Sequence, residues 1–89
     1  MKKKINIPNK LGLHARASSK LVQLTNKFEC DIQIGKEELI VDAKSILGLL
    51  SLAASYNTEI EIETNGSDEK DAMEQMIKLF ESKFGEEDE

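Results

Sequence analysis

Two hydrophobic periodicities alternate along this chain, and each predicts a different element. Residues 3–7 alternate polar and apolar side chains, which predicts a half-buried strand. The strand should end at Pro8, because proline has no N–H to donate to a sheet. Between about residues 15 and 27 the apolar positions recur every three or four residues, which predicts an amphipathic helix. The predicted apolar face of this helix consists of Ala17, Leu21, Leu24 and Phe28.

The middle of the chain returns to the alternating pattern. Residues 31–34 and 38–42 predict the two strands of a hairpin. A short helix is predicted over residues 45–55, because Ser45 is a favourable N-cap and an apolar run follows it. Residues 58–64 then alternate isoleucine with glutamate, which predicts a strand with one buried and one exposed face.

A turn over residues 65–68 precedes the last predicted helix and supplies its N-cap, with acidic side chains near the positive end of the helix dipole. The element order is βαββαβα. It predicts an α+β fold, an open-faced two-layer sandwich in which a four-stranded antiparallel sheet carries three helices on one face. Residues 1–85 should form the domain, and residues 86–89 should be a disordered acidic tail. The apolar face of the last helix consists of Met73, Met76, Ile77, Phe80 and Phe84.

Composition narrows the classes of function. A chain of 89 residues forms one domain. No apolar run approaches the roughly 20 residues that a membrane span needs, and no apolar stretch follows the basic N-terminus as in a signal peptide. A cytoplasmic protein without membrane insertion is therefore expected. The net charge of −5 argues against nucleic acid as a partner. With one histidine and one cysteine, the chain offers no metal-ligand spacing, and we expect no cofactor.

The residues best suited to chemistry lie where the first loop meets the first helix. A helix N-terminus favours bound anions through its unpaired N–H groups, here the amides at Ala15 and Ala17. His14 places a nucleophilic imidazole beside these amides, and Arg16 adds a planar cation that suits phosphate oxygens. Gly12 lets the loop approach closely. The segment predicts a phosphohistidine site.

Other interpretations of the same residues remain open at this point. His14 is equally consistent with a simple capping role and Arg16 with a surface cation. Small βαββαβ domains also serve as amino-acid sensors or interaction modules. An enzyme with His14 as general base is less favoured, because the chain shows no acid partner and no cofactor site.

A resemblance to a known family separates these interpretations. Residues 9–17, Asn-Lys-Leu-Gly-Leu-His-Ala-Arg-Ala, resemble the active-site signature of the HPr family, the histidine-containing phosphocarriers of the bacterial phosphotransferase system. Residues 42–48, Asp-Ala-Lys-Ser-Ile-Leu-Gly, are similar to the regulatory-serine motif of that family. The two motifs lie at the separation usual in the family, and the resemblance covers the chain up to its acidic tail.

The resemblance implies a carrier and not an enzyme. Enzyme I, phosphorylated from phosphoenolpyruvate, would transfer the phosphoryl group to a ring nitrogen of His14, with Arg16 beside it. The carrier would then pass the group to sugar-specific or nitrogen-type Enzyme IIA proteins. HPr kinase/phosphorylase would modify Ser45, and a regulatory paralogue acting through this serine alone is disfavoured by the presence of the histidine. Ala17 departs from the family, since many members have proline there, and we expect an effect on transfer rate and partner preference.

A docking surface is predicted on the short helix. On a two-layer domain this helix cannot bury every face, so Ile46, Leu47 and Leu50 should form an exposed apolar patch. The resemblance implies that Enzyme I, Enzyme IIA proteins and the serine kinase bind there. Lys20 and Lys44 should add positive charge near this surface, and the protein should be a monomer.

Overall fold

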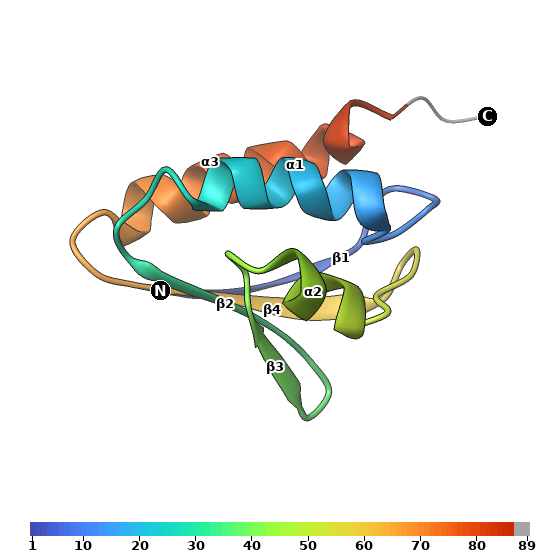
Figure 1. Ribbon diagram of the computed structural model, residues 1–89, viewed down its shortest axis with the longest axis horizontal. Coiled ribbons are helices and arrows are strands. Elements are labelled where there is room, and N and C mark those ends of the chain that lie inside the picture. Colours follow the sequence, from blue (N-terminus) through green and yellow to red (C-terminus); the bar gives the residue numbers. More distant parts are fainter. Residues whose placement is uncertain (87–89) are drawn as a thin grey trace.

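The computed structural model describes residues 1–86 and shows a sheet in one layer and helices in the other (Figure 1). The element order βαββαβα confirms the prediction. A single 3₁₀ turn, η1, follows the last helix at Lys83–Gly85. The strands are β1 (Lys2–Asn6), β2 (Asp31–Lys36), β3 (Leu39–Asp42) and β4 (Glu59–Asn65). The helices are α1 (Ala15–Thr25), α2 (Ile46–Ser51) and α3 (Glu69–Glu81).

The sheet has the strand order β1-β4-β2-β3, and all neighbouring strands are antiparallel. In β4 the side chains of Ile60 and Ile62 are buried, as the alternation predicted. The opposite face remains open and polar. There Glu61 lies across from Lys4 of β1, a pairing of opposite charges that favours this register.

The three helices cover one face of the sheet, so the predicted open-faced sandwich is confirmed (Figure 1). The core between the layers is mainly aliphatic, with Phe80 and Phe84 in edge-to-face contact at 5.0 Å between ring centroids. None of the helices within residues 1–86 has the length and apolar character needed to cross a membrane. Large side chains that are fully buried include Ile7, Leu21, Ile32, Ile34, Leu49, Ile62 and Met76.

All three predicted helices extended too far along the sequence, and Phe84, predicted on the last helix, lies in η1 after α3 ends at Glu81. The first helix ends at Thr25 and not near residue 27, and its C-cap is Asn26. The short helix ends at Ser51, before the predicted residue 55. Its end coincides with a left-handed backbone at Ala53 (φ 49°), a conformation that cannot continue a right-handed helix.

The turn before α3 is hydrogen-bonded to the loop between α1 and β2. Asp68 occupies the predicted N-cap position, but its side chain does not cap the helix. Its carboxylate instead accepts hydrogen bonds of 2.9 Å from the backbone N–H groups of Glu29 and Cys30, and these bonds lower the pKa of Asp68. Burial, followed by contact with Asp68, raises the pKa of the Cys30 thiol to about 11. The thiol is therefore protonated and unreactive near neutral pH.

The C-terminal segment differs from the prediction at Glu86. This residue was expected to begin a disordered tail, but η1 turns the chain back toward the start of α1, and the Glu86 carboxylate contacts Asn9 and His14. The sequence of the tail lacks apolar residues, so its composition alone did not reveal the contact. The rest of the predicted tail, residues 87–89, lies outside the described residues.

Candidate functional site

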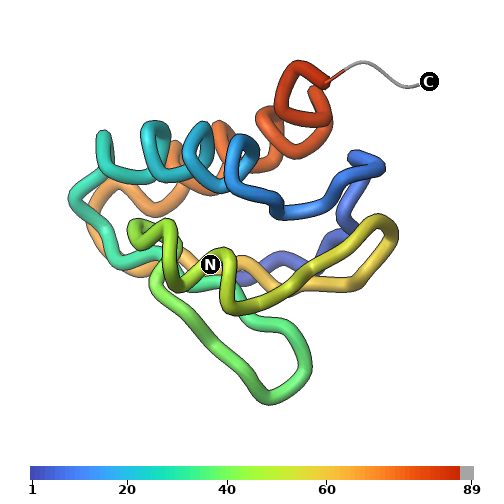
Figure 2. Tube along the Cα trace, turned by 45° about the vertical axis from the view of Figure 1, so that its right-hand side comes forward, coloured from blue at the N-terminus to red at the C-terminus, as the bar shows by residue number. Residues whose placement is uncertain are grey.

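The loop before α1 is held against the segment that precedes β4. Gly12 adopts a left-handed conformation (φ 68°), and its N–H donates to the carbonyl of Asn9 at 3.1 Å. The next amide, of Leu13, donates to the carbonyl of Ala54 at 2.9 Å. Figure 2 shows these two segments, blue and yellow, side by side. This close approach fixes the point at which α1 begins.

His14 is the N-cap of α1. Its backbone is extended (φ −76°, ψ 179°), and its carbonyl accepts the first helical hydrogen bond, from Ser18 N–H at 2.8 Å. The imidazole makes no capping bond, and its side chain is 27% exposed. The ring is therefore available for chemistry and is not committed to stabilising the helix end.

The first turn of α1 provides the expected amide donors directly after His14 in the sequence. The amides of Ala15, Arg16 and Ala17 precede the first N–H that can bond within the helix, so they have no intrahelical acceptor. The side chain of Ala17 is buried in the core, while Ala15 is exposed. The Arg16 side chain is exposed and forms no ion pair with residues 1–86.

An acidic residue that the sequence did not single out lies against His14. One carboxylate oxygen of Glu86 contacts His14 Nε2, and the other accepts a 3.0 Å hydrogen bond from Asn9 Nδ2. Asn9 is fully buried, and the same Nδ2 donates to the carbonyl of Gly12 at 2.9 Å. The buried Asn9 Oδ1 has no hydrogen-bond partner among the described residues. Asn9 thus links the loop to the C-terminal segment.

Ser45 is the N-cap of α2, as predicted. Its Oγ accepts a hydrogen bond of 3.0 Å from Gly48 N–H. The serine is partly exposed at the start of the helix. Because α2 packs against α1, the serine and the histidine belong to neighbouring helices of one layer.

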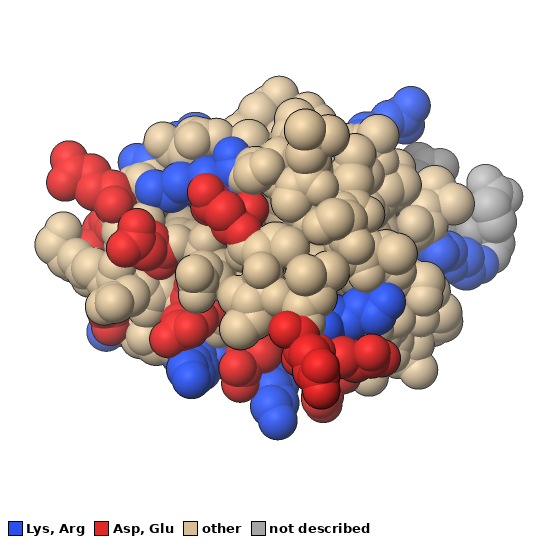
Figure 3. All heavy atoms as spheres, turned by 60° about the horizontal axis from the view of Figure 1, so that its bottom comes forward, with Lys and Arg blue, Asp and Glu red and all other residues tan. Residues whose placement is uncertain are grey.

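The predicted apolar patch is exposed in the structure. Leu47 is 81% exposed, Ile46 40% and Leu50 37%, whereas Leu49 of the same helix is fully buried. Figure 3 shows a wide uncharged area beside a band where acidic and basic side chains are interspersed. We refer to Ile46, Leu47 and Leu50 as the α2 patch.

Lys20 and Lys44 lie in intramolecular contacts that the sequence did not predict. The Lys20 ammonium donates to the carbonyl of Phe84 at 2.6 Å, and the Lys44 ammonium donates to that of Phe28 at 2.7 Å. Both ammonium groups stabilise the fold. Their charges still add to the local potential, but their positions are set by the chain itself.

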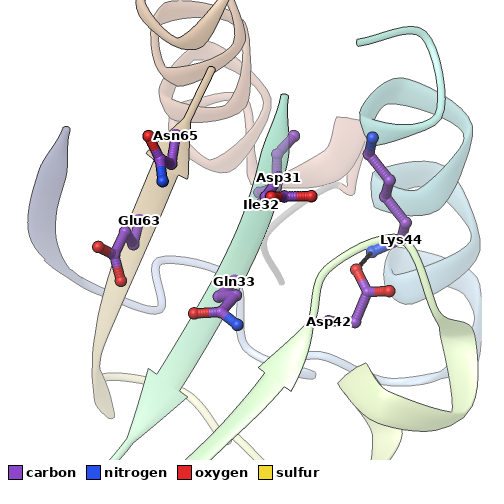
Figure 4. Close-up of a pocket in the computed structure, with 7 residues that line it drawn as sticks. All are labelled: Asp31, Ile32, Gln33, Asp42, Lys44, Glu63 and Asn65. Carbon is purple, nitrogen blue, oxygen red and sulfur yellow. Dashed lines mark hydrogen bonds between the residues drawn. The ribbon is translucent and has the colours of Figure 1, made fainter. Parts of the chain in front are cut away.

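A hollow lies on the polar side of the sheet, away from His14 (Figure 4). It contains three carboxylates and one ammonium group. None of its residues belongs to the loop or the first turn of α1, and no group of acidic, histidine or cysteine residues within 1–86 is arranged to hold a metal ion. It is lined by Asp31, Ile32, Gln33, Asp42, Lys44, Glu63 and Asn65.

Comparisons with known proteins agree on one family. Residues 1–82 match a family model described as the phosphorylation site of the PTS HPr component. The chain is 46% identical over 86 residues to a phosphocarrier protein HPr of Neisseria meningitidis, with 97% of each chain covered. It is also 46% identical over 80 residues to HPr of Cupriavidus necator, with 90% of each covered. The crystal structure of HPr-C-His from Thermoanaerobacter tengcongensis is similar with a TM-score of 0.94, at 41% identity and 98% coverage of each chain.

Proposed function

This chain belongs to the HPr family of phosphocarriers of the phosphotransferase system, and from that premise we propose that it carries a phosphoryl group on His14. One observation supports this assignment above all. The single imidazole of the chain lies at the N-terminus of α1, where it is partly exposed and makes no capping hydrogen bond. The amides that follow it have no intrahelical acceptor. This is the environment that a nucleophile needs when its product is an anion.

The chemistry requires no cofactor. The Glu86 carboxylate engages Nε2 of His14, which leaves Nδ1 as the ring nitrogen whose lone pair can attack phosphorus. The added phosphoryl oxygens would be stabilised by the first-turn amides and by the guanidinium of Arg16. The product is a phosphohistidine intermediate, which the chain carries without turning over a small molecule.

The proposed exchange partners are those that the family implies. Enzyme I, phosphorylated from phosphoenolpyruvate, is the donor, and Enzyme IIA proteins are the acceptors. The proposed setting is the cytoplasm, because a chain with one cysteine and no internal disulfide suits a reducing compartment.

The experiment that tests the carrier role is intact-mass analysis after the chain is mixed with Enzyme I and phosphoenolpyruvate. We expect a gain of one phosphoryl group, its loss in mild acid, and its localisation to the peptide that contains His14. An omission of phosphoenolpyruvate serves as the blank. A phosphoryl group on a serine peptide, or none with an Enzyme I shown to be active, would refute the assignment.

We further propose that Ser45 is phosphorylated by HPr kinase/phosphorylase and that the α2 patch is the docking surface for the partner proteins. A phosphate at the start of α2 is compatible with the helix dipole, so the fold should tolerate it. The modification would add about two negative charges next to the exposed side chains of Ile46 and Leu47. Docking would weaken although His14 itself is unchanged.

Negative charge on this surface should slow phosphoryl transfer without unfolding the protein. The variants Leu47→Glu and Ser45→Asp should each lower the transfer rate from Enzyme I by about tenfold or more. Leu47→Glu removes an exposed apolar contact, and Ser45→Asp places a negative charge beside the α2 patch. Aspartate is also a good N-cap, and Leu47 is mostly exposed, so both melting temperatures should stay close to that of the parent chain. Rapid-quench transfer assays and thermal melts measure the two effects.

Leu39→Glu is the matched control for Leu47→Glu. Leu39 is an exposed leucine on β3, outside the α2 patch, and its replacement adds the same charge. Its transfer rate should equal that of the parent chain. Equal slowing in both leucine variants would mean that total charge and not docking at α2 controls the rate.

A further inference from the structure

The contact between Glu86 and His14 is built by a specific turn of the chain. After α3 ends at Glu81, the left-handed residues Lys83, Phe84 and Gly85 (φ 57°, 57° and 74°) reverse its direction. The Phe84 ring is buried against Phe80, and the Phe84 carbonyl accepts the 2.6 Å bond from the Lys20 ammonium of α1. The position of Glu86 therefore depends on core packing and on a bond to the same helix that His14 begins.

The protonation of the pair follows from the surroundings of the carboxylate. Burial alone would raise the pKa of Glu86. Hydrogen bonds from His14 and Asn9, together with the charges of His14 and Lys20, lower the pKa by more than burial raises it, so the pKa of Glu86 lies below its usual range. The group is thus a carboxylate near neutral pH. An ionised carboxylate can only accept hydrogen bonds. Nε2 of His14 must therefore carry the hydrogen in this contact.

We propose that Glu86 is a positioning residue for phosphoryl transfer, which holds the His14 ring in the tautomer whose Nδ1 bears the lone pair. This inference rests on the proposed carrier function. Without the carboxylate, the neutral ring would divide between its two tautomers and would rotate more freely. In the form with hydrogen on Nδ1, that nitrogen cannot attack phosphorus.

The carboxylate also suits the charge that develops during the step. The Nδ1 lone pair forms the bond to phosphorus, and the bond from phosphorus to the donor atom breaks with its electron pair returning to the donor. The Nε2 hydrogen stays on the ring, so the ring gains positive charge as the bond forms. Glu86 lies on the Nε2 side and stabilises that charge, while the phosphoryl group is added on the other side of the ring.

The test compares Glu86→Gln with the parent chain. We expect the transfer rate from Enzyme I to fall by roughly tenfold, by analogy with the loss of activity when a carboxylate that orients a metal-binding histidine is removed. Side-chain ¹⁵N NMR of the unphosphorylated protein, at a pH where the ring is neutral, should show Nε2–H alone in the parent and a mixture of tautomers in the variant. Glu81→Gln removes the same charge from an exposed site on α3 and should change neither result.

The outcomes separate this inference from the carrier role itself. A parent chain that accepts no phosphoryl group refutes the carrier role, while the NMR spectra still report on the contact. A parent that accepts it, with Glu86→Gln equally fast, overturns the positioning role even if the tautomers change. A faster Glu86→Gln would show that the carboxylate competes with phosphate for the site, and this also overturns the proposal.

Discussion

A His14→Ala variant should accept no phosphoryl group from Enzyme I and phosphoenolpyruvate, while its free energy of unfolding stays within about 1 kcal/mol of the parent value. The loss should be complete because the chain has one histidine and no other imidazole can replace it. The fold should survive because the ring makes no capping bond, and the backbone carbonyl that starts α1 is retained. Only the side-chain contact with Glu86 is removed.

Intact mass and urea denaturation, measured on the same preparation, check both parts of this prediction. Arg16→Ala is the companion variant: it keeps the nucleophile but removes the guanidinium, so its transfer should be slowed and not abolished. An acid-labile phosphoryl group on His14→Ala would place the acceptor elsewhere in the chain. A collapse of stability would show that the ring is structural.

A Gly12→Ala variant should lose both stability and transfer rate. Alanine is strained at φ 68°, and its Cβ would lie 2.4 Å from the carbonyl oxygen of Ala54 and 2.8 Å from the Cα of Ser55. Both atoms belong to backbone, so the loop itself must move. Strain and overpacking together should lower the free energy of unfolding by about 3 kcal/mol. His14 follows two residues later and would move with the loop.

Gly66→Ala is the control that separates the loss of stability from the loss of transfer rate. A Cβ at Gly66 (φ 150°) would lie 2.7 Å from the Cβ of Cys30, a comparable clash in the turn before α3, at the other end of α1 from the histidine. This variant should be less stable in urea but should transfer phosphoryl groups at the parent rate once folded. If Gly12→Ala also transfers at the parent rate below its unfolding midpoint, the loop does not position His14.

The sheet and the long helices could be predicted because burial imposes a local period. Ile60 and Ile62 of β4, and Met73 and Met76 of α3, are buried at the spacing that each element requires. The capping role of Ser45 could also be predicted, because its bond with Gly48 N–H joins residues only three positions apart. Such features depend on residues that are close in the sequence.

The parts that could not be predicted depend on residues that are distant in the sequence. Glu86 reaches His14 because three left-handed residues redirect the chain, and of these only Gly85 is a residue type that suggests such a backbone. Lys20 was expected to support docking, yet its ammonium reaches a carbonyl at the far end of the chain. The spacing of apolar residues does not indicate which distant groups a long side chain contacts. The histidine was predicted, and the group that faces it was not.

The strand order determines when a newly made molecule can form the proposed phosphoryl-acceptor site. His14 leaves the ribosome early, but the loop that positions it needs the carbonyl of Ala54, and β1 has no neighbour in the sheet until β4 has been synthesised. The contact from Glu86 comes later still. Partly translated chains therefore hold the histidine without its surroundings. For the proposed phosphoryl transfer, a nascent chain that has not been synthesised through β4 (Glu59–Asn65) should therefore be a poor acceptor, because its His14 lacks these surroundings.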